Sequence, residues 1–139
     1  MTDAERLVRA YYDAFNRGDR AAFLGLLADD VAHDINQGGR ETGRDAFARF
    51  MDHMNRCYRE EIIDLVVMAD ATGGHAAAMF TVRGSYLATD PGVPVGTPLA
   101  SGQTYSLPAG AFFTLRDGRV ARIANHYNLG DWVRQVGGY

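Results

Sequence analysis

The chain has 139 residues, a length typical of one domain with a single core, and we predict one domain over residues 1–139. The net charge of -3 argues against nucleic acid or an anionic membrane as the main partner, because both bind basic surfaces. The absence of lysine excludes Schiff-base and pyridoxal-phosphate catalysis. No signal peptide or membrane span is recognised and Cys57 is the single cysteine, so we expect a cytoplasmic protein.

Two helices are predicted in the first 30 residues. Thr2–Glu5 fits a capping box, and apolar residues follow at helical spacing as far as Gly18, which would end the first helix. Asp19 is a typical N-cap for a second helix, which we predict to end at Asp29–Asp30.

A short extended segment and a third helix are predicted next. Residues 31–36 are extended in character, and residues 37–39 have the glycines of a turn. Residues 44–56 carry apolar side chains at i, i+3, i+4 and i+7, which predicts a helix with one buried face.

The second half of the chain is predicted to form a sheet, because its apolar residues alternate and are often β-branched. A loop rich in proline and glycine covers residues 90–102, and a short helix is predicted over 130–136. The strands are predicted over residues 62–67, 76–89, 103–116 and 119–128. This order predicts an α+β fold in which the helices cover one face of a strongly curved, mostly antiparallel sheet and enclose a pocket.

Asp34 is the acidic residue that is hardest to assign to the surface, because it lies in an apolar segment between two helices. A carboxylate in an apolar pocket has a raised pKa and can act as a general base. The alternative is a structural ion pair with Arg40 or Arg44. His33 would point to the opposite face of an extended segment, so only one of the two can face the pocket, and the residues leave open which one does.

Other candidate pocket residues come from the inward positions of the strands and helices. Asn125 and Tyr127 share one face of the last strand, and a buried amide needs hydrogen-bond partners. The remaining candidates are apolar or aromatic and would serve equally well as core. The predicted pocket wall comprises His33, Phe50, Met54, Phe80, Val82, Tyr86, Phe113, Tyr127 and Trp132.

No metal site is predicted, because no two histidines have the spacing of metal ligands and no histidine–cysteine cluster is recognised. His53 and His75 are interpreted as solvent-exposed. Cys57 is interpreted as a packing residue.

Four segments of the chain resemble the NTF2-like superfamily, and in particular its ketosteroid-isomerase and SnoaL-like branch. They span residues 11–19, 27–31, 42–44 and 117–120. The resemblance implies an α+β cone with a pocket, and a homodimer formed through the outer face of the sheet.

The resemblance also implies roles for single residues. Ketosteroid isomerase uses an aspartate base with a tyrosine and a protonated aspartic acid as oxyanion donors. In this chain the base falls at or next to Asp34, the tyrosine falls on Tyr11, and the second acid falls on Ala111, which cannot donate a hydrogen bond. Asn125 and Tyr127 are predicted to substitute for that donor.

These observations predict a cofactor-free isomerase or cyclase that acts on a small apolar carbonyl compound. Asp34 (or His33) would abstract a proton, and Tyr11 and Asn125 would stabilise the enolate. The alternative is a non-catalytic module of the same fold that binds a small ligand or serves as a dimeric assembly unit.

Overall fold

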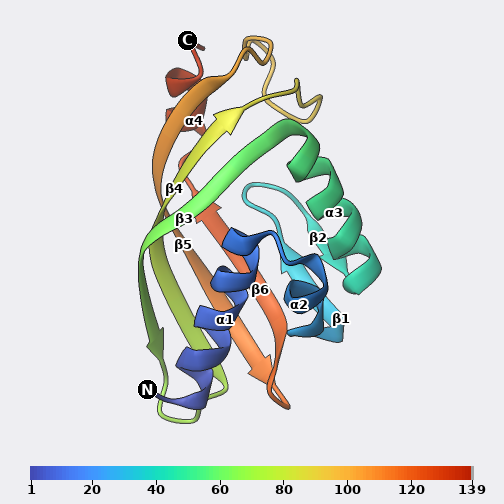
Figure 1. Ribbon diagram of the computed structural model, residues 1–139, viewed down its shortest axis with the longest axis vertical. Helices are drawn as coiled ribbons and strands as arrows, with labels where there is room; N and C mark the ends of the chain where they lie inside the picture. The colour runs from blue at the N-terminus through green and yellow to red at the C-terminus, as the bar shows by residue number, and fades with distance from the viewer. Residues whose placement is uncertain (139) are drawn as a thin grey trace.

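The computed structural model describes residues 1–138 as four helices and one six-stranded sheet (Figure 1). The helices are α1 (Asp3–Arg17), α2 (Arg20–Gly25), α3 (Arg44–Cys57) and α4 (Leu129–Gln135). The strands are β1 (Leu27–Asp34), β2 (Arg40–Thr42), β3 (Tyr58–Ala69), β4 (His75–Tyr86), β5 (Gln103–Arg116) and β6 (Arg119–Tyr127). The α+β class predicted from the sequence is confirmed.

Local sequence determines where the first two helices begin and end. The Thr2 side chain accepts a hydrogen bond from the Glu5 amide, and Gly18 ends α1 in the left-handed region with φ of 67°. The Asp19 side chain caps α2 by accepting from the Ala22 amide. The C-terminal end of α1 is attached to the sheet by the side chain of Asn16. Its side-chain Nδ2 donates to the Ile62 carbonyl at 2.9 Å, and its Oδ1 accepts from the Ile62 backbone amide at 2.8 Å.

The sheet has the strand order β2-β1-β6-β5-β4-β3. The antiparallel meander from β3 to β6 was predicted. The mixed character of the sheet was not, because β1 pairs in parallel with β6, far away in the sequence. β2 was also missed, since three exposed residues carry no periodic signal.

The second helix is shorter than predicted. It ends at Gly25, and β1 already begins at Leu27. The Val120 amide donates to the Leu26 carbonyl at 2.8 Å, and Leu27 is fully buried against β6. This long-range pairing overrides the helical spacing of the segment. Among residues 1–138, no helix has the length and apolar character needed to cross a membrane.

The inner face of the sheet is covered by helices at two ends, visible in Figure 1 as the end beside α1 and the end beside α4. We call the first the aromatic end, because its core includes Tyr11, Tyr12, Phe23, Phe80 and Phe113. At the other end, Trp132 of α4 packs on inward rings of the sheet, with Tyr86, Tyr105 and Leu107 among its buried neighbours.

Candidate active site

β1 places His33 and Asp34 on opposite faces of the sheet, as alternation along a strand requires. His33 faces inward and is 2% exposed. Its ring stacks on Phe47 with a centroid distance of 4.2 Å, and its Nε2 lies 3.4 Å from Nδ2 of Asn125. Burial lowers the pKa of His33 to about 4, so the imidazole is neutral at pH 7. His33, and not Asp34, is therefore the member of the pair that faces the interior.

Asp34 lies on the outer face, between two arginines. Arg40 Nε donates to one carboxylate oxygen at 2.6 Å, and Arg122 Nε donates to the other at 2.9 Å. The hydrogen bond from Arg40 is the main reason that the pKa of Asp34 falls to about 2. The structure does not bring Asp34 together with Asn125 on the inner face, because the sheet separates them. The geometry instead matches the structural alternative of an ion pair with Arg40.

Tyr11 lies in the aromatic end and is 5% exposed. Its ring centroid is 4.6 Å from that of Phe23 and 5.5 Å from that of Phe113. Burial raises the pKa of the Tyr11 hydroxyl, so the group is protonated at any ordinary pH. Its neighbour Tyr12 is equally buried, and the Tyr12 hydroxyl finds no hydrogen-bond partner within residues 1–138.

The predicted wall residues divide into two groups. One group is buried in the core and comprises Phe80, Phe113, Tyr86 and Trp132. The other retains exposure although it faces inward: Phe50, Met54 and Val82 are half-buried, and Tyr127 is 39% exposed. The inner face is therefore more deeply buried at the aromatic end than around these four side chains.

Glu60, a half-buried carboxyl group that was not among the predicted site residues, also lies on the inner face. Glu60 of β3 is opposite Gly84 of β4, which in turn is opposite Tyr105 of β5. The Tyr105 hydroxyl donates to Glu60 Oε2 at 2.6 Å. Burial raises the pKa of Glu60.

Gly84 makes the contact between Glu60 and Tyr105 possible. A Cβ atom at Gly84 would lie 2.6 Å from both Cζ and the hydroxyl oxygen of Tyr105. The missing side chain therefore lets the tyrosine ring lie across β4 and reach the carboxylate on β3. This is a close approach of the kind that only glycine permits in a strand.

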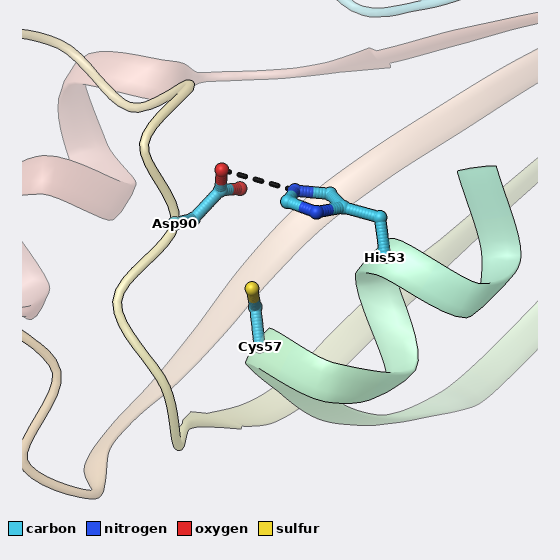
Figure 2. Close-up of side chains that lie close together, drawn as sticks. All are labelled: His53, Cys57 and Asp90. Carbon is cyan, nitrogen blue, oxygen red and sulfur yellow. Dashed lines mark hydrogen bonds and ion pairs between the residues drawn. The ribbon is translucent and has the colours of Figure 1, made fainter. Parts of the chain in front are cut away.

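A second carboxylate, Asp90, lies in the loop after β4 and is 9% exposed. It accepts from the Tyr58 hydroxyl at 2.7 Å and lies 3.0 Å from Nε2 of His53 (Figure 2). Burial opposes its ionisation, but hydrogen bonds from the Gly92 amide and Tyr58 outweigh burial and lower the pKa of Asp90. The interpretation of His53 as solvent-exposed holds only in part, because its side chain is 33% exposed and also pairs with Asp90.

The carboxyl and hydroxyl groups of this region form one cluster, which we call the polar end. Burial raises the pKa of the Tyr127 hydroxyl, and the charges of Glu60 and Asp90 contribute in the same direction. The polar end comprises Tyr58, Glu60, Asp90, Tyr105 and Tyr127, and the His33–Asn125 pair lies next to it on β1 and β6.

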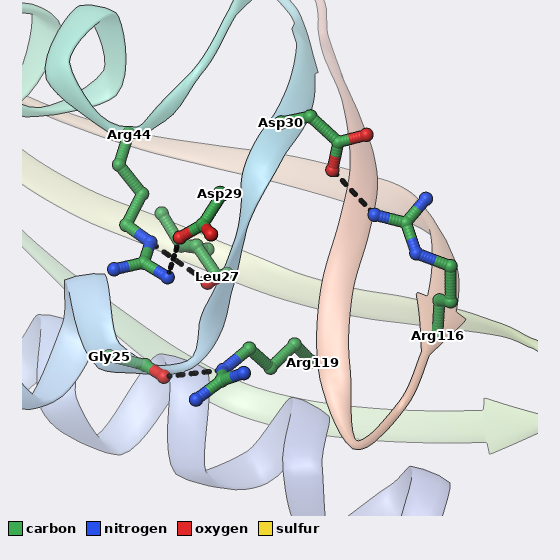
Figure 3. Close-up of polar contacts among 7 residues, drawn as sticks. All are labelled: Gly25, Leu27, Asp29, Asp30, Arg44, Arg116 and Arg119. Atoms are coloured by element: carbon green, nitrogen blue, oxygen red, sulfur yellow. Dashed lines mark hydrogen bonds and ion pairs between the residues drawn. The ribbon is translucent and has the colours of Figure 1, made fainter.

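Two hollows lie outside this inner face. One, of about 560 Å³, is at the start of α3 and includes Arg44. The other, of about 340 Å³, lies between β1 and the hairpin that joins β5 to β6. Figure 3 shows that several of their charged groups already have partners: Arg44 donates to the Leu27 carbonyl and to Asp29, and Arg116 pairs with Asp30. Neither hollow includes a predicted wall residue.

The sequence contained a signal for the polar end that was not followed far enough. Ile62 faces inward, so alternation backwards along β3 places Glu60 and Tyr58 on the same face. The change of period at Glu60 was recognised, but the strand was identified from its apolar residues between 62 and 67, and Tyr58 and Glu60 were not considered as site residues. The approach of Tyr105 to Glu60 across Gly84 depends on the sheet register, which the sequence does not reveal.

A curved sheet with helices across its inner face, and polar groups at one end of that face, defines a protein of the NTF2-like fold. The SnoaL-like domain family matches residues 8–123, and the chain belongs to this family.

Solved structures support the same assignment. Three proteins named "putative polyketide cyclase" are similar to this chain over almost their whole length. That from Pseudomonas putida is 60% identical, with a TM-score of 0.92, and 99% of each chain is covered. That from Xanthomonas campestris pv. campestris is 53% identical, with a TM-score of 0.91 and 97% of each chain covered. That from Silicibacter sp. is 46% identical, with a TM-score of 0.91, and covers 97% of this chain and 96% of its own. The comparison with curated proteins gives no match.

Proposed function

We propose that this SnoaL-like protein is a cofactor-free enzyme of the isomerase or cyclase type, which transfers a proton on a small, largely apolar carbonyl compound. The observation that carries the proposal is the half-buried Glu60 carboxyl group on the inner face, to which the Tyr105 hydroxyl donates at 2.6 Å. A carboxyl group with a raised pKa near apolar walls is suited to general acid–base catalysis.

In this mechanism Glu60 is the general base. Desolvation makes its carboxylate a stronger base than one in water, and the hydrogen bond from Tyr105 fixes its orientation. The carboxylate takes a proton from the carbon next to the substrate carbonyl. The electron pair of the broken C–H bond moves to the carbonyl oxygen, which gives an enolate.

The neighbouring donors stabilise the enolate oxygen. Burial raises the pKa of the Tyr127 hydroxyl, so it keeps its proton and can donate a hydrogen bond. Asn125 keeps the role of hydrogen-bond donor that was proposed from the sequence. Its side-chain Nδ2 lies 3.4 Å from Nε2 of the neutral His33, which orients the amide. Return of the proton to a different carbon gives an isomer, and attack of the enolate carbon on a second carbonyl gives a ring. Neither outcome requires a cofactor.

The proposal departs from the sequence-based hypothesis in the identity of the base. Asp34 is held by two arginines on the outer face, so we assign its expected role to Glu60. Tyr11 is not used, because it is packed among rings at the aromatic end.

The substrate class is inferred from the walls and from the relatives. Phe50, Met54 and Val82 present apolar surface beside the polar end. The names of the similar proteins favour a polyketide-like carbon chain. In such a chain the carbonyl groups are close together, and the C–H bonds between them are the most acidic.

The test compares Glu60→Gln with Glu61→Gln. Glu61 is the next residue on β3, faces the outer side and pairs with Arg83 at 2.6 Å, so it is a matched control. The assay follows deuterium exchange into a panel of apolar 1,3-dicarbonyl compounds by NMR. We expect Glu60→Gln to lower the enzymatic exchange rate about 10²–10⁴-fold and Glu61→Gln to leave it unchanged.

The pH profile of the wild-type protein adds a second readout. Because the pKa of Glu60 is raised, the exchange rate should decrease on acidification, and the midpoint of this decrease should lie above the pH at which ordinary carboxyl groups titrate. Equal exchange rates in the two variants would exclude Glu60 as the base. Binding of a dicarbonyl compound without exchange above the uncatalysed rate would favour the non-catalytic ligand-binding alternative.

We also propose a homodimer formed through the outer face of the sheet. Four apolar side chains on β3, β4 and β5 are 41–56% exposed there: Val66, Met68, Met79 and Phe112. The register places them in two adjacent rows, one through Val66 and Met79 and one through Met68 and Phe112. A continuous apolar patch of this kind is typical of an interface, and an outer sheet face is complementary to its own copy.

The dimer is tested with Phe112→Asp, and Leu99→Asp is the matched control. Leu99 is 75% exposed in the loop before β5, away from the patch. Analytical ultracentrifugation should show a dimer for the wild type and for Leu99→Asp, and a monomer for Phe112→Asp. A wild-type protein that stays monomeric at high concentration would exclude this interface.

A further inference from the structure

A cluster of three possible metal ligands lies at the end of α3. His53 and Cys57 are one helical turn apart, so their side chains lie on the same face of the helix. Asp90 approaches them from the loop after β4, as Figure 2 shows. One donor atom from each residue, a nitrogen, a sulfur and an oxygen, lies within 4.8 Å of the other two.

The carboxylate of the cluster is held in position by its surroundings. The Asp90 amide donates to the Tyr86 hydroxyl at 3.0 Å, and the Gly92 amide donates to Asp90 Oδ1 at 2.8 Å. The Tyr58 hydroxyl donates to Oδ2 at 2.7 Å. Because these hydrogen bonds already fix the Asp90 carboxylate, it loses little conformational entropy when it coordinates a metal.

The burial of the three residues leaves one side open. Cys57 is 4% exposed and Asp90 is 9% exposed, whereas the His53 side chain is 33% exposed. An ion could therefore enter beside the imidazole and reach two ligands that are shielded from water.

We propose that His53, Cys57 and Asp90 bind one zinc ion, with a water molecule in the fourth position. Thiolate, imidazole and carboxylate are all zinc ligands, and the sulfur and nitrogen donors disfavour calcium and magnesium. Zinc bonds of about 2.0–2.3 Å place tetrahedral ligands roughly 3.3–3.8 Å apart. The observed spread of up to 4.8 Å requires a contraction of about 1 Å. His53 Nε2 and Asp90 Oδ1 are already 3.0 Å apart, so the Cys57 sulfur and these two groups must move towards one another when zinc binds.

Zinc binding would replace the hydrogen bond that now joins Asp90 to α3 with stronger bonds. In the structure this contact is the His53–Asp90 hydrogen bond of 3.0 Å, which zinc would replace with coordinate bonds. The metal-bound protein should therefore unfold at a higher temperature than the metal-free protein. This inference can be tested separately from the proton-transfer proposal, because Glu60, the proposed base, is not a ligand.

The sequence was interpreted as having neither paired histidines nor a histidine–cysteine cluster, and the second part of this interpretation is wrong, because His53 and Cys57 lie together with Asp90. A histidine and a cysteine four residues apart on a helix also point to one side, but Asp90 is in a different segment of the chain. Only the fold shows that the loop returns to α3.

The experiment is a titration of chelator-treated protein with Zn²⁺ and, separately, with Co²⁺. We expect one ion per chain, a rise in Tm with Zn²⁺, and with Co²⁺ the visible bands of a tetrahedral site together with a thiolate-to-cobalt charge-transfer band. His53→Gln and Cys57→Ser should each weaken binding by more than the 10–100-fold typical of losing an outer partner. Cys57→Ser should also abolish the charge-transfer band.

His75→Gln is the matched control, because His75 is exposed and lies 3.4 Å from a different carboxylate, Asp70. It should bind Zn²⁺ and Co²⁺ like the wild type. Since Cys57 is buried, the partly exposed His53 variant keeps the test valid if Cys57→Ser folds poorly. No saturable binding to the wild type, or binding that His53→Gln leaves unchanged, would overturn the proposal.

Discussion

The two ends of the inner face share the same strands but differ in what the strands present. At the aromatic end, inward positions of β4 and β5 carry Phe80 and Phe113, which are 9% and 2% exposed. At the polar end, the same two strands carry Gly84 and Tyr105. Both ends contain packed rings, but at the polar end carboxyl and hydroxyl groups also hydrogen-bond to one another. A single sheet can therefore combine an apolar core with a polar cluster, provided that the side chains change along each strand.

The largest expected effect is a loss of stability at the aromatic end. Phe113→Ala should destabilise the protein by about 3–5 kcal/mol, because a buried ring is replaced by a cavity. Tyr127→Phe at the polar end should change stability by less than about 1 kcal/mol, because Tyr127 is 39% exposed and only its hydroxyl is removed. Urea unfolding of both variants measures the difference. Similar values for the two would contradict the contrast between the ends.

The next effect is a pH dependence that comes from His33, which lies against Phe47 and Phe50. Burial holds its pKa at about 4, below the value of about 6.5 in an unfolded chain. As the pH falls below 6.5 the unfolded chain takes up the proton first, so this contribution to stability is present above pH 6.5 and is lost towards pH 4. The loss is about 2–3 kcal/mol at about pH 4.5.

His33→Phe should remove this pH dependence. Phenylalanine preserves the ring packing but cannot be protonated, so its unfolding free energy should fall less between pH 7 and about pH 4.5 than that of the wild type. The exposed His75→Gln variant is the control and should follow the wild type. An acid response in His33→Phe as steep as that of the wild type would show that other groups are responsible.

A smaller effect is expected where the two ends meet on β4. Gly84→Ala places a methyl group where the Tyr105 ring lies, so the ring must move away from Glu60. We expect a cost of about 1–3 kcal/mol from overpacking. We also expect a loss of dicarbonyl exchange activity, which Tyr105→Phe should reproduce in part by removing the hydrogen bond at 2.6 Å. Unchanged activity in both variants would show that Tyr105 does not orient the base.

The sequence predicted the fold more fully than the site, for physical reasons. Capping at Thr2 and Asp19 and the alternation along β5 are local, so α1, the start of α2 and the span of residues 103–116 were predicted correctly. The parallel pairing of β1 with β6 is a long-range contact and left no local signal. The contacts of the site are also long-range. The hydrogen bond between Tyr105 and Glu60 depends on the register of β3, β4 and β5, and the contact between Asp90 and His53 of α3 depends on the path of the loop after β4.

The smallest expected effect is at Asp34, the residue that the sequence favoured as the base. Its side chain is 26% exposed and is shared by Arg40 and Arg122, so Asp34→Asn should cost about 1 kcal/mol or less at pH 7. Because the folded-state pKa is lowered to about 2, this stability is present above about pH 4 and is lost as the pH falls towards 2. Asp34→Asn should retain dicarbonyl exchange. If instead it abolishes exchange while Glu60→Gln does not, the base lies on the outer face and the contrast between the two ends does not explain the chemistry.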